Sequence, residues 1–164
     1  QDFDVEISNT RRTLARVPEG KNDWVPHAKS MPLGKLAMHC ATIPLFGHYL
    51  IEDEGMDLAA PKRQHVPLNF VSREAALQQL QEAAAQCRGS LAGASDEHMM
   101  QPWKFSYGEQ VISDKPRLLA YKMFFFNHMI HHVGQLGVYL RLNDIPVPGI
   151  YGPSADEPWA PPKK

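Results

Sequence analysis

The segment FNHMIHHVGQLGVYLRL, residues 126–142, places three histidines within five positions of an otherwise apolar helical run. At about 100° per residue, His128 and His132 fall in the middle of the stripe that would face a bundle interior. His131 falls at the edge of that stripe and is less well aimed. Because a buried imidazole is costly unless its nitrogens are satisfied, these residues need a partner.

A second apolar stretch, residues 33–52, predicts another helix with a histidine on its buried face. Several apolar side chains lie within about 60° of His39 on this helix. They are Leu36, Ile43, Phe46 and Leu50. His48 lies about 180° away from His39 by the same rule, so it points elsewhere. Two separate helices therefore each place histidine in a buried stripe.

Four helical segments account for most of the chain, at about 3–17, 33–52, 72–91 and 115–143. Long connections join them, and a proline-rich tail follows at about 144–164. No stretch alternates apolar and polar residues regularly enough to predict a sheet. The segment QPWKFSYGEQV in the second long connection is compatible with a short extended piece. We therefore predict one all-α domain over residues 1–164, a four-helix bundle with a long crossover connection.

Composition excludes several classes of function. The net charge is −1 and the 17 lysines and arginines are scattered, which argues against a nucleic-acid partner. No apolar run approaches the roughly 20 residues that would span a membrane. Two cysteines, Cys40 and Cys87, are too few for a disulfide framework and are interpreted as packed residues in a reducing, cytoplasmic protein.

The convergence of His39, His128 and His132 predicts a metal site. A single histidine on an apolar face is more often a core residue bonded to a carbonyl. Three histidines in one layer of the bundle are better explained by a divalent ion, most simply zinc or nickel. Such an ion satisfies all three and retains open coordination positions. Gln135, near the same face, either orients a ligand or is an ordinary satisfied polar residue.

Two motifs resemble the DinB-like metalloenzyme superfamily: LAMHCA at 36–41 and NHMIHHVGQLGVYLRL at 127–142. The segments WVPHAKSMPLGKLAMH and IPVPGIYGPSAD are also similar to members of this group. The resemblance implies an up-down-down-up four-helix bundle whose divalent metal is held by His39, His128 and His132. Val133 departs from the basic residue that many members carry there, which weakens an inference of an anionic substrate.

The same resemblance bears on activity, because the superfamily includes thiol-S-transferases that use thiols such as bacillithiol, and a mycothiol-dependent isomerase. It implies an enzyme that transfers a low-molecular-weight thiol, as cosubstrate, to a small electrophile through a metal-bound thiolate. Alternatives are a hydrolase that uses metal-bound water, and a non-catalytic metal-binding protein associated with stress. Hydrolysis needs a general base. The carboxylates left open for that role are Glu54 and Asp156, both in loops.

Two further expectations concern the surface. The last helix carries apolar or small residues outside the histidine stripe, which predicts a homodimer. These residues are Ile130, Val133, Gly134, Gly137 and Val138. Four loop residues either border the site or close the ends of the bundle. They are Trp24, His27, Trp103 and Tyr151.

Overall fold

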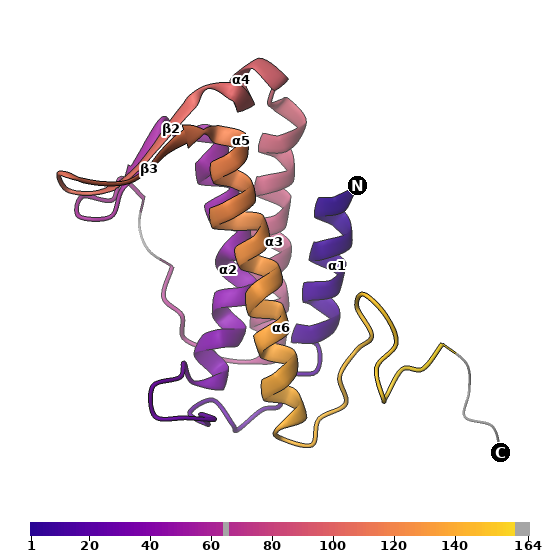
Figure 1. Cartoon of the computed structure of the whole chain (residues 1–164). Helices are drawn as coiled ribbons and strands as arrows, with labels where there is room; N and C mark the ends of the chain where they lie inside the picture. Colours follow the sequence, from indigo (N-terminus) through magenta and orange to yellow (C-terminus); the bar gives the residue numbers. More distant parts are fainter. Residues whose placement is uncertain (64–65, 160–164) are drawn as a thin grey trace. The chain divides into compact units, whose positions relative to one another are not determined.

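The computed structural model describes residues 1–63 and 66–159 (Figure 1). These residues form two compact units. One comprises residues 1–41, 68–80 and the described part from 130 onward, and the other comprises the described residues of 42–67 and 81–129. The expectation of a single domain stays a prediction.

Helices dominate both units. Their bounds are α1 Asp2–Leu14, α2 Leu33–Glu52, α3 Arg73–Gly93, α4 Asp96–Met100, α5 Arg117–Ala120, the π-helical segment η1 Tyr121–Phe126, and α6 Asn127–Arg141. The predicted helix at 33–52 is α2 itself. The predicted helix at 115–143 runs over residues 117–141 instead, as two α-helices, α5 and α6, separated by the π-helical η1.

Each unit has its own apolar core. Fully buried side chains of the first unit include Leu14, Leu33, Leu36, Leu136 and Leu140. Those of the second include Leu50, Trp103, Phe125 and Met129. No helix among the described residues is both long and apolar enough to cross a membrane.

A three-stranded sheet lies in the second unit, in the strand order β1-β2-β3. Strand β1 (Gly55–Asp57) pairs in parallel with β2 (Pro102–Tyr107). Strand β3 (Gln110–Pro116) pairs antiparallel with β2, as the adjacent ribbons in Figure 1 show. The prediction of an all-α four-helix bundle is therefore wrong, because part of the chain forms a mixed sheet.

Local irregularity explains why the sheet gives so weak a sequence signal. The register between β2 and β3 shifts between Phe105 and Ser106. Along β2, Trp103 is buried, Phe105 is half-buried and Ser106 is buried again, so the two-residue period breaks in the middle of the strand. Strand β1 has only three residues and no buried position, too short for any pattern to emerge.

The C-terminal end of α2 is held by side chains from this sheet and from α5. The last carbonyls of a helix have no intrahelical partner and need outside donors. Arg117 Nη1 donates to the carbonyls of Leu50 and Asp53, at 2.6 Å each, and Trp103 Nε1 donates to the Asp53 carbonyl at 3.0 Å. Arg117 is only 4% exposed, and burial lowers the pKa of its guanidinium below its ordinary value.

We predict that Arg117→Gln lowers the free energy of unfolding by about 3 kcal/mol, because the buried carbonyls lose charged donors. Chemical denaturation followed by circular dichroism measures this value. Lys122→Gln, an exposed cation in η1, is the matched control and should change stability by less than about 0.5 kcal/mol. Equal stability of the two variants would contradict the role assigned to Arg117.

Candidate metal centre

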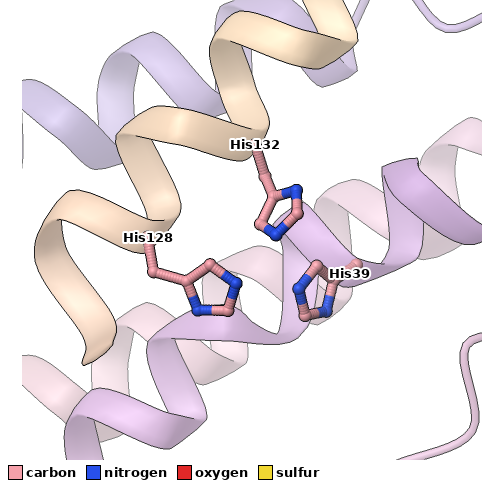
Figure 2. A group of neighbouring side chains, drawn as sticks. All are labelled: His39, His128 and His132. Carbon is pink, nitrogen blue, oxygen red and sulfur yellow. The ribbon is translucent and has the colours of Figure 1, made fainter. Parts of the chain in front are cut away.

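Three histidines from two helices converge in the structure. His128 and His132 lie one turn apart on α6, and His39 comes from α2. Each offers one ring nitrogen, and these nitrogens all lie within 4.8 Å of one another. The rings of His39 and His132 meet edge to face, with centroids 4.5 Å apart, and Figure 2 shows the three rings turned toward a common point.

Acceptors behind two of the rings fix their tautomers. His128 Nδ1 lies 3.2 Å from the Phe124 carbonyl oxygen, and His132 Nδ1 lies 2.7 Å from Gln135 Oε1. Since these oxygens only accept, each Nδ1 carries the hydrogen and donates it. The Nε2 atoms of both rings therefore present lone pairs, the form in which imidazole binds a metal.

The donor set fits a divalent ion. Three neutral nitrogens at these separations can converge on one ion by small ring rotations, at the roughly 2.0–2.1 Å typical of zinc–histidine bonds. All three residues are half-buried, so the site stays open to a small molecule. That these residues bind metal, and which metal, stays a prediction. Gln135 accepts a hydrogen bond from His132, so its position is that of a residue that orients a ligand.

The other histidines lie in different surroundings. His131 is exposed, with its ring 4.9 Å from that of His132. His48 Nδ1 forms a 2.7 Å hydrogen bond with Ser90 Oγ, as expected for a residue on the far side of α2 from His39. His98 Nε2 donates to the carbonyl of Ile51 at 2.8 Å and helps to close the end of α2.

Cysteines and carboxylates take no part in the group. In the portion of the chain that the structure describes, the one cluster of potential ligands at metal-binding separation is purely histidine. Cys40 and Cys87 are buried, and burial raises the pKa of each thiol to about 12, which keeps it protonated. Asp156 accepts from Arg141 and from the backbone N–H of Val147 instead.

Three of the four residues expected in loops make structural contacts within the chain. Trp24 packs edge-on against Tyr139, with ring centroids 5.5 Å apart. Trp103 is not in a loop but in β2, where it is 0% exposed and part of the core. Tyr151 donates to the buried carboxylate of Glu6, a structural contact.

One contributor to the site has no side-chain signature in the sequence. The carbonyl that receives the His128 proton belongs to Phe124, inside η1. There the Asn127 N–H donates to the carbonyl of Lys122, five residues back, so the helix widens just before the histidines. Such π-helical turns are frequent at functional sites. A backbone acceptor is not recognisable from residue type.

The fold and the site together define a class of protein, a mainly helical one in which three histidines converge. Residues 2–136 match the DinB superfamily. The chain belongs to the DinB superfamily, which confirms the predicted resemblance.

Solved structures agree with that placement. The chain is similar to a DinB-like protein from Bacillus cereus ATCC 10987, with 19% identity, a TM-score of 0.63, and coverage of 91% of this chain and 93% of that one. It is also similar to a DinB-like protein from Bacillus subtilis, with 17% identity, a TM-score of 0.66, and coverage of 90% and 94%. At these identities the likeness shows the shared fold. No curated protein matches the chain.

We predict that the purified protein binds about one divalent ion per chain through the three histidines. His39→Ala and His132→Ala should each abolish stoichiometric binding, measured by elemental analysis after gel filtration. His48→Ala and His98→Ala remove histidines that have other partners, and should retain the metal. Full metal content in His39→Ala would refute the assignment.

A second prediction concerns the residue behind His132. Gln135→Ala removes the acceptor that fixes the His132 tautomer, so metal affinity should fall by roughly 10- to 100-fold. Competition with a chromophoric chelator gives the dissociation constant. Gln81→Ala, an exposed glutamine of α3, is the matched control. Unchanged affinity in Gln135→Ala would make this hydrogen bond incidental.

Proposed function

We propose that this protein is a metal-dependent enzyme that transfers a low-molecular-weight thiol to a small electrophile. The observation that carries this proposal is the donor set of three imidazoles with no carboxylate in the group. Such a set supports a reaction that needs a bound nucleophile but no adjacent general base. Membership of the DinB superfamily supports it further.

When bound, a divalent ion on three neutral nitrogens supplies open positions and positive charge, which favour the ionised form of an incoming thiol. The protein's own residues prepare the site. His39, His128 and His132 present lone pairs to one point, while Gln135 and the Phe124 carbonyl prevent two of the rings from changing tautomer. Because the rings are half-buried, less water reaches the point toward which they turn.

The proposed transfer is a nucleophilic substitution at carbon. The thiol loses its proton to solvent or buffer, its sulfur forms a bond to the electrophilic carbon, and the bond from that carbon to the leaving group breaks with its electron pair. No oxidant or reductant is required. Cys40 and Cys87 are buried free thiols and do not serve as nucleophiles. Their free state also supports our inference of a reducing, cytoplasmic compartment.

Hydrolysis is the second enzymatic candidate and requires a base beside the nucleophilic water. The histidine cluster contains no carboxylate, and Asp156 is engaged by Arg141. A protein that binds metal without turnover is the third candidate. It would give the same metal stoichiometry as the enzyme, so only activity separates them.

The direct assay supplies metal-loaded protein with bacillithiol, mycothiol, glutathione or cysteine, each with a chlorobimane-type acceptor. We expect at least one thiol to give fluorescent adduct well above the background of His132→Ala. If no thiol reacts while ester or amide substrates are cleaved, hydrolysis replaces the transferase proposal. If neither reaction occurs, the non-catalytic alternative holds.

We also propose that the protein is a homodimer formed through α6. A groove of about 310 Å³ runs beside Gly134, Gly137 and Val138. Val138 is 58% exposed, and a Cβ added at Gly134 would meet nothing within 4 Å. Glycine inside a helix costs about 0.5–1 kcal/mol relative to alanine, and among the described residues no neighbour of Gly134 requires it. Val133, expected on this surface, is instead 3% exposed and belongs to the core.

Analytical ultracentrifugation tests this assembly. Wild type should sediment as a dimer at micromolar concentration, and Gly134→Gln should shift it to monomer because the side chain occupies the space meant for the partner. Gly89→Gln is the matched control, since Gly89 is an exposed helical glycine with equally open surroundings. A monomeric wild type at high micromolar concentration would contradict the proposal.

A further inference from the structure

Three phenylalanines from separate elements of the second unit form an aromatic cluster: Phe46 of α2, Phe105 of β2 and Phe124 of η1. The ring centroids of Phe46 and Phe105 are 6.1 Å apart at 55°, and those of Phe105 and Phe124 are 5.1 Å apart at 58°. Trp103 packs against the cluster, 6.3 Å from Phe46 and 5.8 Å from Phe105.

The cluster differs in exposure from the core on which it rests. Trp103 and Phe125 are fully buried, whereas all three phenylalanines of the cluster are half-buried. Each of these residues therefore keeps part of its surface uncovered by the chain. Grouped apolar residues that are partly uncovered mark a binding site more often than isolated ones do.

The cluster lies close along the chain to one of the three histidines, His128, in the same unit. Phe124 lies one turn before His128, and its carbonyl receives the His128 Nδ1 proton. Phe46 lies seven residues after His39 on α2, which is two turns along the same face. Along the chain, the cluster therefore comes within about one helical turn of His128.

Ring geometry indicates what kind of occupant fits. The phenylalanine rings are tilted at 55° and 58°, between the stacked and the edge-to-face arrangements in which aromatic rings attract one another. A planar aromatic group continues this pattern, with contacts that an aliphatic group of equal size lacks.

We propose that the cluster of Phe46, Phe105 and Phe124 binds the aromatic body of the electrophile and holds its reacting carbon beside His128. The site would therefore prefer aromatic or benzylic acceptors over small aliphatic ones. That the bound molecule is the electrophile of a transfer reaction rests on the proposed function. The binding of an aromatic ring to the cluster does not depend on turnover.

Trp103 reports binding directly. In a Trp24→Phe/Trp159→Phe background it is the remaining tryptophan of the three in the chain, and it lies beneath the cluster. The probe is 4-nitrobenzyl alcohol, an unreactive aromatic whose nitro group quenches tryptophan. We expect saturable quenching in metal-loaded protein, with cyclohexylmethanol competing at least tenfold more weakly than unsubstituted benzyl alcohol.

Variants locate the bound ring. Phe105→Leu and Phe46→Leu preserve apolar volume and should each weaken probe binding by about tenfold. Tyr107→Leu removes an aromatic from the same strand that is 61% exposed and outside the cluster, and should leave binding unchanged. Unsaturable quenching, or wild-type affinity in both phenylalanine variants, would overturn the proposal.

A kinetic arm separates this proposal from the proposed function. With the preferred thiol, Phe105→Leu should lower kcat/KM for 4-nitrobenzyl chloride about tenfold while leaving that for chloroacetamide and the KM for thiol unchanged. Equal loss for both acceptors would overturn the specificity. Absence of turnover with every acceptor, together with saturable probe binding, would refute thiol transfer but support the aromatic site.

Discussion

Two oxygen atoms behind the histidine rings determine what the site can bind. The Phe124 carbonyl and Gln135 Oε1 accept hydrogens from His128 and His132, so both rings are held as Nδ1–H tautomers. One nitrogen of each of these rings and one nitrogen of His39 lie within 4.8 Å of one another. Nitrogens at this separation can converge on one divalent ion, which is the reason for assigning a metal site to them.

Contacts within the second unit fix the C-terminal end of α2, the helix whose first half carries His39. The sheet brings Trp103, and α5 brings Arg117, to the last carbonyls of α2, so the helix that carries His39 ends in satisfied hydrogen bonds. The same strand β2 supplies Phe105 to the aromatic cluster. A part of the chain that the bundle prediction treated as a connection thus closes α2 and supplies one ring to the aromatic cluster.

The metal-centre geometry was largely predictable because it depends on local periodicity. His128 and His132 are four residues apart within α6, and His39 lies on a helix whose limits are clear, so rotation about the helix axis was sufficient to select all three. The sheet was not predictable by that route. Its β1 is too short to show a pattern, and the shift at Phe105 disrupts the alternation in β2. The widened turn of η1 and its carbonyl acceptor depend on backbone geometry, which residue types do not encode.

The most direct test of the central claim is anomalous diffraction from crystals of the zinc-loaded protein, with data collected on both sides of the zinc absorption edge. We expect one strong peak per chain, at about 2.0–2.1 Å from Nε2 of His128, Nε2 of His132 and a ring nitrogen of His39. A peak bound through Nδ1 of His128 or His132, or one located away from these three residues, would contradict it.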